Sequence, residues 1–165
     1  MKLIKQIIID SPPTKYVDRK KKTIDPKTNK LKETTYYLTA NLFYSQQNTF
    51  LTNKIVYDCK NFLYKHFEGI PPLSFIRIEL IYQSEKDNFD LDNKGYFWLK
   101  CILDLIKEPS KRKSNKKSLF EIKPLNIIYD DSCKYLKDIS LSYKKGNPKL
   151  IVNLYGVLKK KETLF

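Results

Sequence analysis

Histidine, cysteine and long apolar runs are scarce in this 165-residue sequence, and each scarcity excludes a class of protein. The single histidine, and three cysteines that stand far apart without CxxC pairing, argue against a zinc site and a disulfide framework. No apolar run approaches the roughly 20 residues that cross a bilayer, so we expect no membrane partner. The first ten residues have a charge inside their apolar stretch and no small-residue cleavage site, which predicts a strand rather than a signal peptide. We therefore expect a cytoplasmic protein, in a bacterium or in the host cell of a phage or virus.

Arginine is also scarce, although the chain is strongly basic. Its 32 basic and 18 acidic residues give a net charge of +14, which is typical of proteins that bind a polyanion and favours nucleic acid as the partner. Only three of the basic residues are arginine, so a lysine is expected by chance at almost any position. Length and a hydrophobic content of 41% predict one domain, residues 1–165, with a real core.

The hydrophobic pattern predicts an α/β (α+β) domain with a mixed sheet and two main helices. One helix is expected over 51–67, ended by Gly69, with His66 in a structural role in its last turn. A second helix is expected to begin at an acidic segment and to end near Pro109. Strands are expected over 2–10, where Ser11-Pro12-Pro13 ends the first one, over 73–83, and over 135–143 and 149–158, which would form a closing hairpin.

Two segments concentrate basic residues and predict contacts with DNA phosphates. Residues 15–32 contain eight basic residues around a turn signal at 25–29, which indicates a basic hairpin. Residues 107–123 contain seven and indicate a basic loop. Either segment could instead be solvated and bind nothing. The candidate DNA-binding residues are Lys15, Arg19, Lys20, Lys21, Lys22, Lys94, Lys111, Arg112, Lys113, Lys116 and Lys117.

Paired aspartates after the strand at 73–83 predict a metal site. Side chains two positions apart point the same way in an extended backbone, so Asp90 and Asp92 can share a cation if both precede the helix. Magnesium held by carboxylates supplies an activated water and stabilises the charge that develops during phosphodiester hydrolysis. The alternative is that the segment only caps the helix, with Asp92 as the capping residue.

The surroundings of this pair resemble the RusA family of Holliday junction resolvases. A DLDN segment, Asp90-Leu91-Asp92-Asn93, follows a strand and precedes a helix with Lys100 and Asp104, and Asp130-Asp131-Ser132 comes later. The first strand, ended by Pro12-Pro13, also looks like the opening segment of that family. The order of elements agrees over nearly the whole chain.

The resemblance implies a RusA-like fold and a homodimer that resolves four-way DNA junctions by paired hydrolytic nicks. Asp90, Asp92 and Asp131 match the catalytic carboxylates of the family, and Asp130 matches the first residue of its aspartate pair. All four are therefore candidate ligands for Mg²⁺, or for Mn²⁺ in its place. The dimer also fits the near two-fold symmetry of a four-way junction, because two matched nicks require two active sites.

The catalytic lysine of the family has no direct counterpart. It stands three residues after the asparagine, where this chain has Tyr96. Lys100 fits if four residues, about one helical turn, were inserted before it, and it would then share a helical face with Asn93. Lys94 is the other candidate, and either one can be an ordinary surface lysine. The basic loop at 107–123 is a second departure, because it is longer than the connection typical of the family.

Two rival functions remain at this point. Glu121-Ile122-Lys123 formally matches the Glu-x-Lys of restriction-type nucleases, but with 29 lysines such a triplet is expected by chance. A non-catalytic, basic nucleic-acid-binding protein fits the net charge as well as an enzyme does. Magnesium distinguishes the binding protein from a nuclease, because a binding protein gains nothing from it, whereas a nuclease without it should bind DNA but not cut it.

Overall fold

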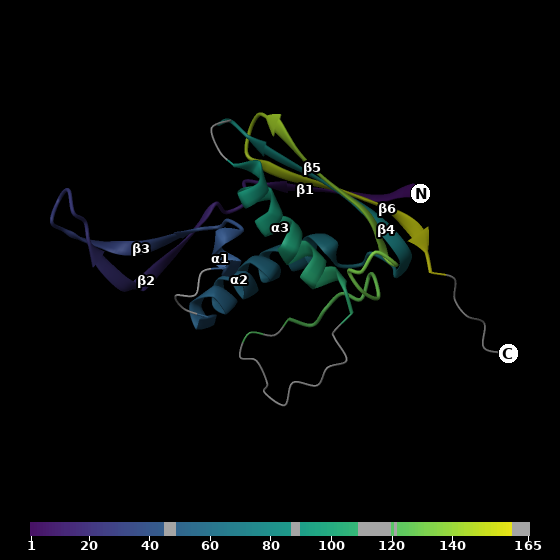
Figure 1. The fold of residues 1–165 in the computed structure, drawn as a ribbon, viewed down its shortest axis with the longest axis horizontal. Helices are drawn as coiled ribbons and strands as arrows, with labels where there is room; N and C mark the ends of the chain where they lie inside the picture. Colours follow the sequence, from purple (N-terminus) through teal and green to yellow (C-terminus); the bar gives the residue numbers. More distant parts are fainter. Residues whose placement is uncertain (45–48, 87–89, 109–119, 121, 160–165) are drawn as a thin grey trace.

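A four-stranded mixed sheet forms the centre of the molecule, and two long helices cover one of its faces in the computed structural model (Figure 1). The structure describes residues 1–44, 49–86, 90–108, 120 and 122–159. Among the described helices none is long and apolar enough to cross a membrane. The sheet contains β1 (Lys2–Asp10), β4 (Leu73–Ser84), β5 (Leu136–Lys145) and β6 (Lys149–Leu158); the helices are α1 (Asn41–Tyr44), α2 (Thr49–Phe67) and α3 (Leu91–Ile106).

The strand order is β1-β6-β4-β5, with β4 antiparallel to β6 and parallel to β5. The predicted closing hairpin is therefore wrong, because β4 lies between the two strands that were expected to pair. The turn between β5 and β6 passes around the end of β4, where the N–H of Gly146 donates to the carbonyl oxygen of Ser84 at 3.1 Å. A glycine suits this turn because its φ is +151°.

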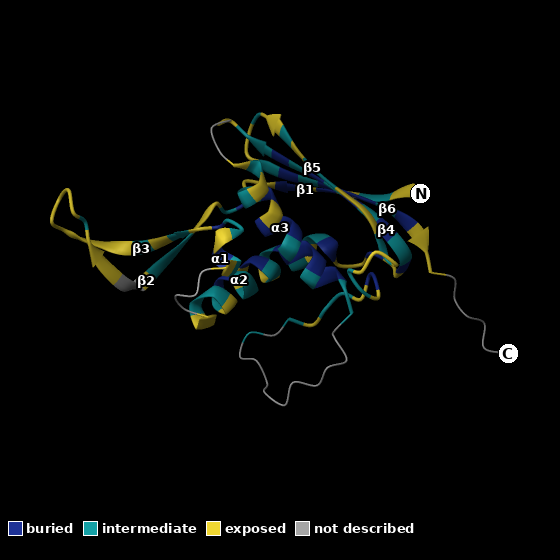
Figure 2. Cartoon of the chain, viewed as in Figure 1, coloured by how far each residue is buried: buried dark blue, intermediate teal, exposed yellow. Residues whose placement is uncertain are grey.

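The hydrophobic core lies between the sheet and the two long helices (Figure 2). The last three turns of α3 are buried on nearly all sides, with Phe97, Trp98 and Ile102 almost fully shielded. Gly95 lets α3 approach β5, because a Cβ at this position would lie 2.5 Å from a methyl group of Leu141. The described residues thus form a single α+β domain with the predicted mixed sheet and two main helices, to which α1 adds one turn.

The predicted basic hairpin is confirmed as a separate two-stranded sheet, β2 (Lys15–Ile24) and β3 (Leu31–Tyr37), that projects from the body (Figure 1). Asp25 forms the turn, since its side chain accepts from the N–H of Lys27 at 2.9 Å and its carbonyl oxygen from Asn29 at 2.8 Å. At the base of the hairpin, the ammonium of Lys54 on α2 donates to the hydroxyl of Tyr16 at 2.9 Å. Most of its described side chains are exposed (Figure 2).

Candidate nucleic-acid interface and metal site

Asp90 caps the N-terminus of α3. Its Oδ1 accepts from the backbone N–H groups of Asp92 at 3.1 Å and Asn93 at 3.4 Å, and its Oδ2 accepts from the side-chain amide of Asn93 at 2.9 Å. The first amides of a helix have no partner within the helix, and an aspartate just before it satisfies them. Two expectations are corrected here: the capping residue is Asp90 and not Asp92, and Asp92 lies inside the first helical turn instead of preceding the helix.

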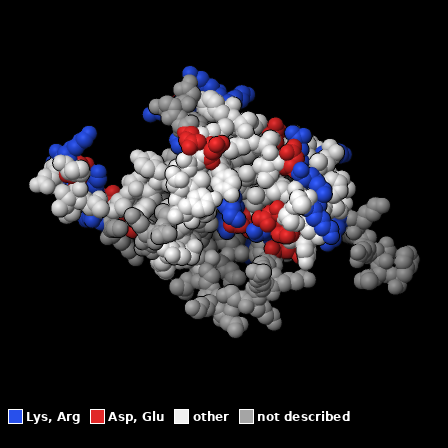
Figure 3. Space-filling view, viewed as in Figure 1, with Lys and Arg blue, Asp and Glu red and all other residues white. Residues whose placement is uncertain are grey.

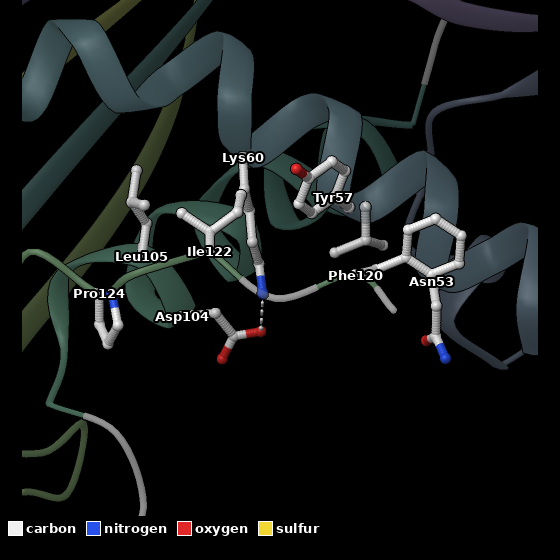
Figure 4. A pocket seen from close by; sticks show the side chains of 9 residues that line it. Asn53, Tyr57, Lys60, Asp104, Leu105, Phe120, Ile122 and Pro124 are labelled. Atoms are coloured by element: carbon white, nitrogen blue, oxygen red, sulfur yellow. Dashed lines mark ion pairs between the residues drawn. The ribbon is translucent and has the colours of Figure 1, made fainter. Parts of the chain in front are cut away.

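The other end of α3 carries a cluster of ion pairs centred on Asp104. Its carboxylate contacts the ammonium groups of Lys100 at 3.0 Å, Lys107 at 3.1 Å and Lys60 at 3.4 Å. Figure 4 shows Lys60 reaching from α2 to Asp104 on α3, at the edge of a pocket. Lys107 also contacts Asp131 at 3.0 Å, so one ammonium joins the two carboxylates.

Backbone hydrogen bonds hold Asp130 and Asp131 at this C-terminal end of α3. The carbonyl oxygens of Leu105 and Ile106 accept from the N–H groups of Leu125 at 2.9 Å and Ile127 at 2.8 Å. The segment 125–128 thereby satisfies carbonyl groups that the end of a helix leaves unpaired. Asp130 stabilises the following bend, because its carboxylate accepts from the backbone N–H of Asp131 at 2.8 Å.

The structure therefore places the predicted carboxylates in two separate groups. Asp90 precedes α3 and Lys107 follows it, so at about 1.5 Å per residue the two ends are about 25 Å apart. The sheet supports this separation: Leu136 at the start of β5 pairs with Ile76, and β4 then runs about 26 Å to Ser84, which is the end of the strand that precedes Asp90 in the sequence. Within one chain, Asp131 is not brought to Asp90 and Asp92.

Within one chain, the described carboxylates do not come together as the predicted magnesium ligands. The structure, over the residues it describes, contains no group of three or more histidine, cysteine, aspartate or glutamate side chains that could hold a metal ion. Magnesium prefers several oxygen ligands at about 2.1 Å, and carboxylates at opposite ends of a 16-residue helix cannot share such a shell.

The pKa values in the Asp104 cluster follow from burial and from the lysines. Burial alone would raise the pKa of the Asp104 carboxyl, but the charges of Lys60 and Lys100 outweigh it and hold the pKa below its usual value. Burial would also raise the pKa of the Asp131 carboxyl, but the hydrogen bond from Lys107 outweighs it, so this pKa too lies below its usual value. Burial would lower the pKa of Lys107, whereas its bonds to Asp131 and Asp104 raise it. These contacts therefore stabilise the charged forms of Asp104, Asp131 and Lys107.

The two candidate catalytic lysines lie in different groups. Lys94 is half-buried in the first turns of α3, near Asp90. Lys100 is ten residues beyond Asp90, about 15 Å along the helix, and pairs with Asp104 instead. The spacings of Asp104 to Lys100 and Lys107 already indicate these two ion pairs in the sequence. No local signal indicates the contact of Lys107 with Asp131 or of Lys60 with Asp104, since both depend on tertiary packing.

The hairpin gathers predicted DNA-binding residues in one irregular stretch of β2. Asp18 pairs with Thr34, and Lys22 pairs with Glu33, so the three residues between them on β2 have no partner on β3. These residues, 19–21, are all basic. Such an irregularity bends a strand, and the side chains of Lys20 and Lys21 lie outside the described part of the chain. Arg19 and Lys22, like Lys15 at the base of the hairpin, are exposed, and Figure 3 shows basic side chains at the far end of the hairpin.

The predicted loop residues Lys111, Arg112, Lys113, Lys116 and Lys117, and Glu121 of the restriction-type triplet, lie outside the described residues. Comparison with known protein families, with curated proteins and with solved structures gives no match to this chain. The resemblance to the RusA family therefore stands on the order of its motifs and elements.

Proposed function

We propose that this protein is a magnesium-dependent endonuclease for branched DNA, active as a two-fold dimer. Each active site takes Asp90 and Asp92 from one chain and Asp131 from the other. The observation that supports this proposal is the position of these carboxylates at opposite ends of α3, a helix about 25 Å long from cap to cap. One chain cannot place them around one cation, whereas two chains with antiparallel α3 helices bring the ends together.

Two-fold symmetry would give two active sites from a single kind of contact between the chains. In such a dimer the contact of one residue with another occurs twice, so the pairing of unlike helix ends creates two identical sites. The edge strand β5 offers one contact of this symmetry. It runs parallel to β4, from the Asp131 end of the sheet toward the Asp90 end. Antiparallel pairing of two β5 edges would therefore set Asp131 of one chain beside Asp90 of the other, and two sites suit paired nicks in a four-way junction.

The residues of each site would have distinct tasks. Asp90, Asp92 and Asp131 would hold the magnesium, which would supply an activated water and offset charge on the phosphate. Lys100, connected to Asp131 through Asp104 and Lys107, would stabilise phosphate charge in the transition state. The hairpin would bind a DNA arm, because basic side chains contact phosphates and the major groove admits a two-stranded ribbon.

A non-catalytic DNA-binding protein is the second candidate, and a specific observation favours it. Asp90 has a structural task as a helix cap, and Asp104 and Asp131 have structural tasks in ion pairs with lysines. The carboxylates would then stabilise the fold only, and the hairpin alone would carry the function.

Complementation between two inactive variants tests the proposal. Asp90→Asn and Asp131→Asn should each abolish nicking of a labelled four-way junction in magnesium, and binding should stay intact or tighten because a negative charge near phosphate is lost. After the two variants are unfolded and refolded together, nicking should return to about a quarter of the parent rate. About half of the dimers are then mixed, and each mixed dimer has one complete site out of two.

Controls separate the outcomes of this experiment. Asp10→Asn, which alters an exposed aspartate paired with Lys149 on β6, should cut at the parent rate. A matched duplex, and omission of magnesium, report on branch selectivity and metal dependence. If the parent binds DNA but never cuts it, the second candidate is correct. If both variants are inactive and their mixture stays inactive, the site is not shared between chains.

A further inference from the structure

A cavity of about 270 Å³ lies beside the Asp130-Asp131 segment. Its walls come from the start of β4, the segment 126–129, the turn before β5 and the end of β6. Pro72 and Leu73 provide an apolar wall, and Tyr129 and Tyr135 provide aromatic surface. Lys134 and Lys159 are the basic residues of the lining. The cavity thus combines aromatic and cationic side chains.

The two tyrosines of this cavity form an accessible aromatic platform. Their ring centroids are 5.2 Å apart and the rings are inclined at 45°. The ammonium of Lys134 lies 5.3 Å from the centroid of the Tyr135 ring, on its face. Tyr129 is 43% exposed, which is high for a large aromatic residue, so much of its ring remains accessible. Proteins that bind single-stranded nucleic acid combine accessible aromatic rings with positive charge in this way.

Polar groups of the same cavity could contact the edge of a base. Asn126 holds a left-handed backbone conformation with φ of 53°, and its exposed amide carries both donors and an acceptor. Glu108 supplies a carboxylate acceptor and is fixed by the bond of its N–H to the carbonyl oxygen of Ile128 at 3.0 Å. The lining of the cavity thus offers aromatic, amide, carboxylate and ammonium groups. Together these groups suit a ligand that has a flat heterocycle with hydrogen-bonding edges and an attached phosphate.

The geometry points to an unstacked nucleobase as the occupant of this cavity. Tyr129 lines the cavity and stands two residues before Asp131, so a DNA strand cut at Asp131 would pass beside the cavity. The net charge of +14 favours DNA over an uncharged aromatic ligand. This inference rests on the proposed function, and it defines the substrate class further, as DNA with an unpaired or displaced nucleotide next to the cleaved phosphate.

Binding to three related duplexes tests the inference. The first is fully paired, the second carries one unpaired nucleotide, and the third carries one unpaired abasic nucleotide, which distorts the backbone equally but has no base. With EDTA present and salt fixed, the parent should bind the second about 5- to 150-fold more tightly than the third, the range for one base–aromatic stack. Tyr129→Ala should abolish this preference, and Tyr129→Phe should retain it because the ring is kept.

Each outcome has a defined meaning. Equal binding of the base and abasic duplexes by the parent overturns the inference and leaves the proposed function in place. A preference that survives in Tyr129→Ala also overturns it, because the base is then read elsewhere. Failure of the parent to bind any of the three duplexes also overturns the inference, while nicking of the four-way junction tests the proposed function separately. The fully paired duplex controls for folding, since Tyr129→Ala should bind it as the parent does.

Discussion

Removing the exposed cations of the hairpin should change the salt dependence of DNA binding by a predictable amount. We consider the triple variant Lys15→Ser, Arg19→Ser and Lys22→Ser, whose members are all exposed on β2. Each cation that neutralises a phosphate contributes about −0.9 to the slope of log affinity against log salt concentration. If all three contact phosphates, the slope should become about 2.7 units less steep.

This difference is large enough to measure by fluorescence anisotropy with a labelled duplex. Between 50 and 200 mM salt, a fourfold increase, the parent should lose about 40-fold more affinity than the variant, since about 2.7 slope units multiply a log ratio of about 0.6. The matched control is Lys2→Ser, Lys5→Ser and Lys65→Ser, which removes the same charge from the start of β1 and the last turn of α2, away from the hairpin (Figure 1). Equal slopes for the two triple variants would refute the assignment of the hairpin.

Two further predictions concern α3. Lys100→Ala should slow single-turnover cleavage by about 100-fold at saturating enzyme with little change in affinity, and Lys94→Ala should slow it less; a larger loss for Lys94→Ala would contradict the assignment. Asp104→Asn should lower the free energy of unfolding at pH 7 by about 1–3 kcal/mol, because Lys60, Lys100 and Lys107 lose their shared partner. The pKa of Asp104 is lowered in the fold, so its contribution is complete above the unfolded pKa of about 3.9 and is lost as pH falls through the folded value. Urea unfolding at pH 7 and pH 2.5 should show that difference shrink, and an undiminished difference at pH 2.5 would contradict the ion-pair explanation.

Local signals in the sequence were sufficient for the individual elements. The strand over 2–10 ends where two prolines cannot donate to a ladder, and the helix over 51–67 ends at Gly69, whose φ is +77°. The turn at Asp25 depends on bonds between residues two to five positions apart, which a sequence pattern can encode. The helix cap was misassigned by two residues, because either aspartate of the DLDN segment can cap and the choice depends on where the first turn closes.

Strand pairing could not be predicted in the same way. A turn signal at 144–148 favours a hairpin between its flanking strands, yet β4 occupies the place between them. Ile76, Ile78 and Leu80 of β4 are fully buried, and the backbone N–H and C=O groups of a buried strand need hydrogen-bond partners on both edges. That requirement comes from the whole sheet, and no pattern near 144–148 contains it.

The ion pairs of Asp104 indicate which chain would supply the lysine of the proposed shared site. Lys100 is connected to Asp131 of its own chain through Asp104 and Lys107, and lies about 15 Å along α3 from its own Asp90. In the shared site, Lys100 and Asp131 should therefore come from one chain and Asp90 from the other.

Complementation between variant chains tests directly which chain supplies Lys100. A chain with both Lys100→Ala and Asp131→Asn should be rescued by an Asp90→Asn chain, because the complete site then takes Lys100 and Asp131 from the second chain and Asp90 from the first. A chain with both Lys100→Ala and Asp90→Asn should not be rescued by an Asp131→Asn chain, because the site that keeps all its aspartates now lacks the lysine. We expect the two mixtures to differ in nicking rate by about the 100-fold loss for Lys100→Ala itself. The reverse pattern would place Lys100 with Asp90 of its own chain, and the ion pairs from Lys100 to Asp131 would then have only a structural role.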